Sequence, residues 1–337
     1  MYSTLRSLIF RLSPETSHNF SLAALSTLHK LKLLKLFYPK LAENKQPVKV
    51  MGLQFPNKLG LAAGLDKNAD HLDALGALGF GFVEVGTVTP KPQEGNPKPR
   101  LFRLADHDAI INRMGFNNKG VEHLLQQVKQ SRYSGIIGIN IGKNLTTSVE
   151  NALDDYLVAM RSVYESADYI TINISSPNTP GLRSLQYGEE LDKLLSRLVE
   201  ERVTLQETTK KYTPIAVKVA PDLSSEEIAS ISEILQKNSI DAVIATNTTL
   251  SREAVADDAQ AEEQGGLSGA PLTERSTEVI RAFYSHLQGS VPIIGVGGIC
   301  SAADAQAKLD AGAELVQIYS CLIYQGPELI NDILKKL

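Results

Sequence analysis

The sequence predicts an α/β protein, a (β/α)8 TIM barrel preceded by a short N-terminal α-helical extension. Eight short segments rich in apolar and β-branched residues recur along the chain, and stretches with helical spacing follow most of them. Near-continuous apolar character is expected of parallel strands that are buried on both faces. The chain has 337 residues, which accommodates a barrel of about 250 residues and an appended segment. The eight segments are KLGLAAG from 58, FVEVGTVT from 82, IIGINIG from 136, YITINISS from 169, IAVKVAP from 215, AVIATNTT from 242, PIIGVGGI from 292 and LVQIYSC from 315.

Local signals agree with this organisation. An open, doubly wound sheet also alternates strands with helices, but eight evenly used units favour a closed barrel. Ser224 and Glu227 form a capping-box pattern at the start of a helix, and Gly312 stands where a helix must end before the last strand. The segments VKVMGLQF near 48 and LFRLADHDAIINRMGF near 101 are expected to form added strands or an inserted loop.

We assign residues 1–45 to the helical extension and residues 46–337 to the barrel. Ser13 and Pro14 form the cap and first turn of a second helix within the extension. The apolar positions at helical spacing are Leu5, Leu8, Ile9 and Leu12 in the first helix, and Phe20, Ala24, Leu28 and Leu31 in the second. No run reaches the roughly 18 apolar residues that a membrane span requires.

The charge of the extension leaves two interpretations open. Residues 1–40 carry six Lys or Arg against one acid, a net charge of +5 that includes Lys35 and Lys40. The helices either cover one end of the barrel or lie in a membrane interface, with apolar side chains in lipid and cations at anionic head groups.

Composition argues against other classes of protein. The net charge is −4, and the residues after 40 carry 28 bases against 37 acids, so a general nucleic-acid binder is not expected. The six histidines are scattered without ligand spacing, and no metal site is expected. Cys300 and Cys321 fit neither a disulfide framework nor a zinc motif, which indicates a reducing compartment.

Polar residues collect where the predicted strands end, which is where a barrel of this kind places its active site. Asn140, Asn173 and Asn247 offer both donors and acceptors, which suits a ligand edged with amide and imide groups. Each could simply cap a helix or hold a turn, so the evidence is their coincidence across strands. The glycines of GVGGI after the seventh strand, and Tyr319 and Ser320 after the eighth, lie where barrels commonly bind a phosphate.

Nine motifs resemble the dihydroorotate dehydrogenases, in the same order and over nearly the whole chain. They are LAAGLDKN, EVGTVTPKPQEGNPKPR, INRMGFNN, INISSPNTPGLR, VKVAPDL, ATNTT, GGLSG, GVGGI and IYS. Soluble members of the family place a cysteine where this chain has Ser176. Together with the N-terminal extension, this serine makes the chain similar to the class 2, quinone-linked branch.

The resemblance implies FMN as cofactor and a defined set of binding residues. The FMN site would comprise Ala63, Gly64, Leu65, Asp66, Lys67, Thr87, Asn140, Asn173, Lys218, Thr246, Gly269, Gly298, Tyr319 and Ser320. The substrate dihydroorotate would be held by Lys67, Asn112, Arg113, Met114, Gly115, Phe116, Asn173, Asn178, Asn247 and Thr248. Lys218 would lie near the pyrimidine end of the flavin, and Lys67 would meet the substrate carboxylate or the flavin.

Ser176 resembles the family's base, which takes a proton from ring carbon 5 while a hydride leaves carbon 6 for the flavin. By itself the string Ser-Ser-Pro-Asn is ordinary turn chemistry. Serine is also a poor base unless its own proton is removed, so we expect Thr179 or a bound water to relay that proton outward.

The implied reaction is the oxidation of (S)-dihydroorotate to orotate in de novo pyrimidine (UMP) biosynthesis. A membrane quinone, ubiquinone or menaquinone, would accept the electrons, and His18 and Arg103 are candidate contacts for its head group. The resemblance further implies a peripheral membrane protein on the cytoplasmic face of the bacterial inner membrane, attached through the N-terminal helices.

Three rival functions are weighed against this one. Soluble fumarate- or NAD-linked dehydrogenases of the same substrate would be favoured by a cysteine at position 176 and no hydrophobic leader. A dihydrouridine synthase acting on RNA would be expected to have a basic surface, whereas the barrel portion here is acidic. A non-catalytic, membrane-bound barrel that retains FMN is the third alternative. Its visible absorption spectrum would not bleach on anaerobic addition of dihydroorotate, whereas that of an enzyme would.

Overall fold

Eight parallel strands form a closed barrel in the computed structural model, which describes residues 2–37 and 46–337. The order around the barrel follows the chain, and the last strand pairs with the first. The barrel strands are β3 (Leu59–Leu61), β4 (Phe82–Val88), β7 (Ile136–Ile141), β8 (Tyr169–Asn173), β9 (Ile215–Val219), β10 (Ala242–Ala245), β12 (Ile293–Val296) and β13 (Leu315–Ile318). All eight predicted segments are confirmed, and the closed barrel is correct.

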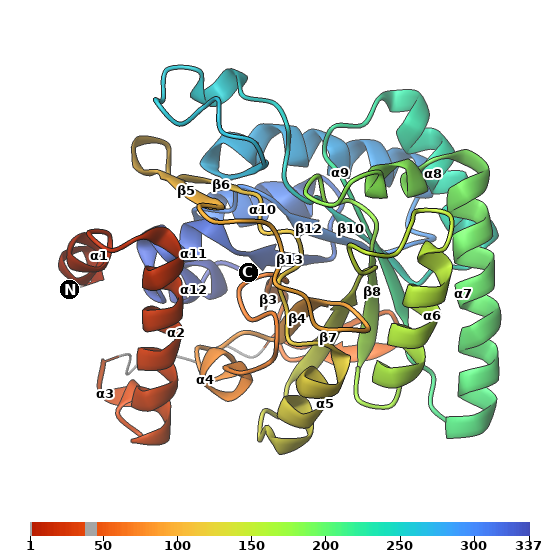
Figure 1. Ribbon diagram of the computed structural model, residues 1–337, viewed down its shortest axis with the longest axis horizontal. Helices are drawn as coiled ribbons and strands as arrows, with labels where there is room; N and C mark the ends of the chain where they lie inside the picture. The colour runs from red at the N-terminus through yellow and green to blue at the C-terminus, as the bar shows by residue number, and fades with distance from the viewer. Residues whose placement is uncertain (1, 38–45) are drawn as a thin grey trace.

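Helices surround the barrel and connect its strands (Figure 1). They are α4 (Leu72–Gly76), α5 (Val121–Gln130), α6 (Ala152–Val163), α7 (Gly188–Thr209), α8 (Ser225–Lys237), α9 (Thr273–Leu287) and α10 (Ala302–Asp310), followed after β13 by α11 (Ser320–Gln325) and α12 (Glu328–Leu334). The predicted capping box is present, since Ser224 accepts from the Glu227 amide and Glu227 accepts from the Ser224 amide. Gly312, at φ +110°, follows the end of α10 as predicted.

Aromatic side chains fill the amino-terminal end of the barrel. Phe82 lies between Phe55 and Tyr169, with ring centroids 5.2 Å and 6.4 Å away in edge-on arrangements. Phe55 belongs to the hairpin of β1 (Val48–Val50) and β2 (Leu53–Phe55), which confirms the added strands expected near 48. Gly138 makes room for Tyr169, because a Cβ there would lie 2.2 Å from its ring. This end of the barrel is therefore closed by packing, and a site can open only at the other end.

A small antiparallel sheet covers part of the carboxyl end. It contains β5 (Leu101–Leu104), β6 (Ala109–Asn112) and β11 (Gly266–Gly269), with β6 in the middle. The strands near 101 are thus confirmed, whereas β11 was not expected as a strand. Short 3-10 helices lie in the neighbouring loops: η1 (Ala105–His107), η2 (Leu182–Gln186), η3 (Glu253–Val255) and η4 (Ala270–Leu272).

The N-terminal helices pack against the barrel domain. They are α1 (Tyr2–Ile9), α2 (Pro14–Lys30) and α3 (Leu34–Phe37), at the left of Figure 1, and Ser13 caps α2 as predicted. The Arg6 guanidinium donates to the Tyr324 carbonyl at 2.9 Å, which joins α1 to α11. No helix in the described ranges is long and apolar enough to cross a membrane. Lys40 and the last residues assigned to the extension, up to 45, lie outside the described residues.

The two cysteines form a pair that their spacing did not indicate. Cys300 follows β12 and Cys321 follows β13, and the structure joins them with their Cα atoms 5.0 Å apart. The expectation that the two cysteines lie outside a disulfide is therefore wrong. The inference of a reducing compartment, which depended on that expectation, loses its support. The reason is barrel closure, which brings the ends of neighbouring strands together although 21 residues separate the cysteines.

Candidate active site

A cavity opens at the carboxyl ends of the barrel strands. It encloses about 1010 Å³ when the space open to solvent at its mouth is included. The predicted site residues that line it are Ala63, Gly64, Lys67, Thr87, Asn112, Met114, Gly115, Phe116, Asn173, Ser176, Asn178, Lys218, Thr246, Asn247, Thr248, Gly269, Gly298, Tyr319 and Ser320. Residues predicted from separate motifs along the chain thus meet in one place.

Four predicted binding residues do not line this cavity. Leu65 packs in the apolar core, and the carboxylate of Asp66 accepts from the amides of Asp70 and His71, at 3.0 and 2.8 Å. Arg113 turns away to form an ion pair with Glu263, with a 2.6 Å Nη1–Oε2 distance. Asn140 lies within the barrel, and its side chain is fully engaged by other side chains. Direct contact between a ligand and these four side chains is therefore not indicated.

Other lining residues had no individual prediction, and they are Ala62, Ser268, Leu272, Val296, Ile299, Gln317, Ile318 and Cys321. Gly297, one of the glycines of GVGGI, also lines the cavity, as predicted. Several of the residues without a prediction are immediate neighbours of predicted ones. Gln317 could have been recognised from the sequence, because a glutamine in an otherwise apolar strand needs a buried hydrogen-bond partner. Its Nε2 finds that partner in Glu84 at 2.8 Å, but its Oε1 is buried without a hydrogen bond among the described residues.

A buried carboxylate organises the polar layer below the cavity. Glu84 of β4 has no solvent exposure. Its oxygens accept hydrogen bonds from Asn140 Nδ2 at 2.8 Å, Tyr169 Oη at 2.9 Å and Gln317 Nε2 at 2.8 Å. Lys218 is buried on β9, and burial lowers its pKa while the negative charge of Glu84 opposes that change. The carboxylate therefore favours a charged ammonium group at the cavity wall.

Asparagines cross-link the loops at the strand ends. Asn173 Nδ2 donates to Thr87 Oγ1 at 2.9 Å, and its Oδ1 accepts from Ser175 Oγ at 3.1 Å. Asn247 Nδ2 donates to the same serine oxygen at 2.9 Å. These contacts join the carboxyl end of β4 to the end of β8 and to the loops after β8 and β10, in one wall that holds the segment containing Ser176.

Ser176 lies in this wall and is almost completely buried. Its Oγ accepts a hydrogen bond from the amide of Asn178 at 3.2 Å, and Asn178 Nδ2 donates to Asn112 Oδ1 at 3.2 Å. Thr179 is buried in the same loop. The hydroxyl of Ser176 and the side chain of Asn178 both lie at the cavity.

Two glycines allow close backbone approach at one end of the cavity. Gly269 has φ +104°, and a Cβ there would lie 2.2 Å from the Asp108 carbonyl oxygen. Gly298 has φ +69°, and a Cβ there would lie 2.3 Å from Thr273 Oγ1. Both positions therefore require glycine, because any side chain would collide with the neighbouring Asp108 or Thr273.

Lys67 lines the cavity with an amine whose charge depends on pH near 8. Burial and the nearby Arg100 cation lower the pKa of Lys67 to about 8, although Glu15 and Asp66 partly oppose them. The Arg100 guanidinium is itself held by Glu15 of α2, with a 2.7 Å Nη2–Oε1 distance. The N-terminal extension thus contributes to the electrostatics of the barrel site.

A second cavity lies between the N-terminal helices and the barrel. It encloses about 2020 Å³ with its open space, and most of its surface is apolar. Tyr319 lines both cavities, so they adjoin at this side chain. Burial raises the pKa of Tyr319 to about 12, which keeps its hydroxyl neutral.

His18 and Arg103, predicted as quinone contacts, both line the second cavity. Burial, with a smaller contribution from Lys67, lowers the pKa of His18 to about 3, so its imidazole is neutral. The Arg103 guanidinium packs over the Phe10 ring at 4.3 Å and donates to the Leu12 carbonyl. Its Nη1 is buried without a hydrogen bond among the described residues, which leaves a donor for a ligand.

The fold and the site define a class of protein. It is a (β/α)8-barrel enzyme with a polar, asparagine-rich pocket at the carboxyl ends of its strands, joined to an apolar pocket beneath added N-terminal helices. The family model for dihydroorotate dehydrogenase matches residues 46–337. The chain belongs to the dihydroorotate dehydrogenase family, whose members are flavoenzymes.

Relatives from bacteria and a solved structure agree with this assignment. The chain is 59% identical to a protein of Saccharophagus degradans, with 98% of this chain and 97% of that protein covered. It is 60% identical to one of Cellvibrio japonicus, with 98% and 96% covered. Both carry the name dihydroorotate dehydrogenase (quinone). The crystal structure of Eimeria tenella DHODH in complex with ferulenol is similar at a TM-score of 0.87 and 37% identity, covering 96% of this chain and 90% of that one.

Proposed function

We propose that this protein oxidises (S)-dihydroorotate to orotate with bound FMN and passes the electrons to a membrane quinone, in de novo pyrimidine (UMP) biosynthesis. The observation that carries the proposal is the pair of adjoining cavities, one polar and one apolar, that share Tyr319. A flat cofactor at their junction can be reached by a polar substrate from one side and by an apolar acceptor from the other. Separate sites for the two reaction partners suit a reaction in which one partner is water-soluble and the other is lipid-soluble.

The polar cavity fits FMN. Gln317 Oε1 and Thr248 Oγ1 are buried without hydrogen bonds among the described residues, and both residues line the cavity. Imide and amide edges of a flavin or of dihydroorotate would supply partners to such atoms. When bound, FMN accepts the hydride that leaves carbon 6 of the substrate. Lys218 provides positive charge along the wall, while Gly269, Gly298 and Ser320 line the part of the cavity in which the phosphate would bind.

The chain's own residues would bind and deprotonate dihydroorotate. Lys67 pairs with the substrate carboxylate, and Asn178 and Asn247 bind its ring amides. Phe116 forms an apolar wall of the same cavity. Ser176 Oγ takes the proton from carbon 5 as it releases its own proton to Thr179 or to a bound water.

The first test is the response of the visible absorption spectrum to substrate. The purified protein is expected to be yellow and to retain FMN, and anaerobic addition of dihydroorotate should bleach it. A short-chain ubiquinone or menaquinone should restore the colour, whereas fumarate and NAD+ should not. A folded protein that is colourless and takes up no FMN would contradict the proposal, and recovery with fumarate would reassign the acceptor.

Ser176→Ala should slow flavin reduction by roughly 10²-fold or more, because the variant has no group at this position to accept the proton. Stopped-flow absorbance under anaerobic conditions measures the rate, and the FMN content should not change. Ser184→Ala is a suitable control, since this serine in η2 is exposed and its hydroxyl donates to the nearby Gly181 carbonyl. An unchanged rate in Ser176→Ala would exclude Ser176 as the base.

Substrate affinity in the reductive half-reaction should depend on the protonation of Lys67. The pKa of Lys67 is about 8, so its ammonium form predominates below pH 8 and is lost as the pH rises above it. The dissociation constant for dihydroorotate should therefore be low and constant below pH 8, then rise by up to about tenfold per pH unit. Lys67→Arg should remove this rise because arginine stays charged. A rise of equal slope in Lys67→Arg would assign the titration to another group.

We propose that the N-terminal helices attach the protein to the cytoplasmic face of the bacterial inner membrane as a peripheral element, and that the barrel domain spans 46–337. Exposed apolar side chains concentrate on these helices and on the turns between them: Leu5, Leu8, Leu12, Phe20, Leu31, Leu33 and Leu36. The apolar cavity that they partly enclose would receive the quinone, with His18 and Arg103 at its head group. The helices would then act both as a cover of the barrel and as an interfacial element.

Binding to phospholipid vesicles tests the membrane proposal. Leu8 and Leu31 are 57% and 62% exposed and do not line the second cavity. Leu8→Ser with Leu31→Ser should weaken cosedimentation with anionic vesicles by at least about tenfold, because two apolar side chains no longer enter lipid. Turnover with vesicle-embedded quinone should fall, while flavin reduction should not change. Val203→Ser, 48% exposed on α7, is the control, and equal binding by all these proteins would refute attachment through the helices.

A further inference from the structure

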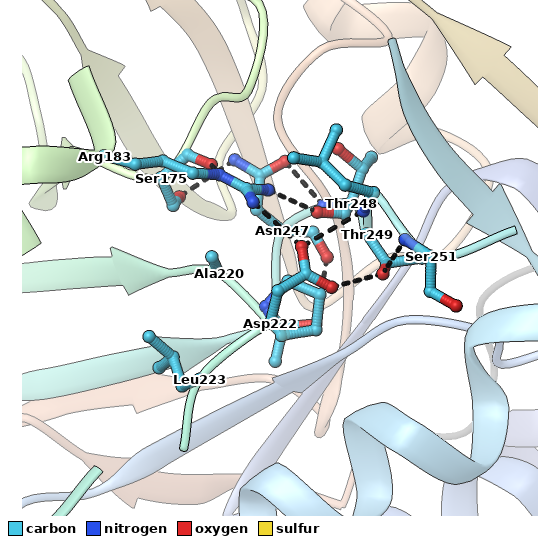
Figure 2. A network of polar contacts seen from close by, with 12 residues as sticks. Ser175, Arg183, Ala220, Asp222, Leu223, Asn247, Thr248, Thr249 and Ser251 are labelled. Atoms are coloured by element: carbon cyan, nitrogen blue, oxygen red, sulfur yellow. Dashed lines mark hydrogen bonds and ion pairs between the residues drawn. The ribbon is translucent and has the colours of Figure 1, made fainter. Parts of the chain in front are cut away.

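One arginine outside the cavity joins three loops at the carboxyl ends of the barrel strands. Arg183 is the second residue of η2, in the segment that follows β8. Its Nε donates to the Ser175 carbonyl at 3.0 Å and its Nη2 to the Thr248 carbonyl at 2.9 Å, while its Nη1 pairs with Asp222 Oδ2 at 2.8 Å. Figure 2 shows the guanidinium among these three partners, which belong to the loops after β8, β10 and β9.

Asp222 extends the same network to the far side of the β10 loop. Its Oδ1 accepts from Thr249 Oγ1 (Figure 2). Its Oδ2 accepts from the Leu250 amide at 3.1 Å. Thr249 is also paired with Leu267 of β11 through two backbone hydrogen bonds, of 3.0 and 2.8 Å. The carboxylate therefore fixes both the guanidinium and the loop to which the guanidinium binds.

The network acts on the two peptides that matter most for the proposed reaction. The Ser175 carbonyl belongs to the peptide bond that carries the nitrogen of Ser176, so fixing this carbonyl fixes the orientation of the Ser176 backbone. Thr248 lines the cavity beside Asn247. Arg183, which does not itself line the cavity, thus holds the proposed base and the proposed substrate-binding loop at a set separation.

An ordinary ion pair does not account for this arrangement. The side chains of Arg183 and Asp222 are 18% and 28% exposed, and pairs near the surface contribute little to stability by themselves. Arginine offers its donors in a planar fork, which can reach two carbonyls and a carboxylate in different directions. Lysine has the same charge but cannot reproduce the fork, so the geometry distinguishes the two residues.

We propose that Arg183 is a positioning residue for dihydroorotate oxidation: it orients Ser176 against the Asn247–Thr248 loop, and Asp222 holds its guanidinium in place. This inference rests on the proposed function. Displacement of a reacting group by about 1 Å can cost about 10²-fold in rate. The effect of losing the fork should therefore appear in the proton-transfer step and be small in overall stability.

A double-mutant cycle tests the proposal in the FMN-loaded full chain. Arg183→Lys should slow anaerobic flavin reduction by dihydroorotate by about 10- to 100-fold, with FMN content and melting temperature close to those of the unmodified protein. In a Ser176→Ala background, Arg183→Lys should slow reduction further by less than about threefold, because its action passes through Ser176. The Kd of orotate, measured from the change in the flavin spectrum, should rise through the Thr248 contact.

Matched variants make the outcome decisive. Arg161 donates through Nε and Nη2 to Glu201 between α6 and α7, so Arg161→Lys removes a comparable fork and should leave reduction unchanged. Asp222→Asn should slow reduction in the same direction as Arg183→Lys, and it carries the test if Arg183→Lys does not fold.

Two results would overturn the positioning role. One is an unchanged reduction rate in Arg183→Lys and Asp222→Asn. The other is a double variant with Ser176→Ala in which the two fold-losses of reduction rate multiply in full. That result would indicate a general structural defect. Both differ from failure of the proposed function, in which dihydroorotate does not bleach even the unmodified protein.

Discussion

The buried carboxylate of Glu84 is the constraint on which the interior of this barrel depends. A charge without solvent exposure is costly unless hydrogen bonds satisfy it. Glu84 obtains three, from side chains on β7, β8 and β13, and Lys218 on β9 contributes an opposite charge. Hydrogen bonds thereby connect four strands, β4 included, through Glu84, and the charge of Lys218 involves a fifth. Below Glu84 the barrel is filled with aromatic rings, and above it the interior is polar.

This division explains why the site lies at one end only. The amino-terminal end is closed by Phe55, Phe82 and Tyr169. At the carboxyl end the strands finish in asparagines, threonines and glycines, whose hydrogen bonds connect neighbouring loops and leave a cavity. The N-terminal helices add a second, apolar cavity that adjoins the first at Tyr319. A protein with this arrangement can keep a polar and an apolar reaction partner apart.

The predictable and unpredictable parts of the site differ in the range of the interactions that define them. Ser224 and Glu227 are three residues apart, and their capping box was predicted because its bonds are local. Asn140 was predicted to bind cofactor, yet its side chain bonds Thr87 and Glu84, which are distant in sequence. Arg183 ends one of the quoted motifs but was assigned no role, because two of its acceptors are backbone carbonyls, which residue identity does not reveal.

The amino-acid sequence alone determined the eight strands, their parallel order and the polar residues that end them, because residue type and spacing indicate burial on both faces and the chemistry of strand ends. The resemblance of its motifs to a known family implied most of the other residues at the cavity. Only the tertiary structure decided which polar side chains reach the cavity and which support it. It also decided the contact between Cys300 and Cys321 and the junction of the two cavities at Tyr319. Closure of the barrel and the docking of the N-terminal helices create these contacts between residues that no local pattern relates.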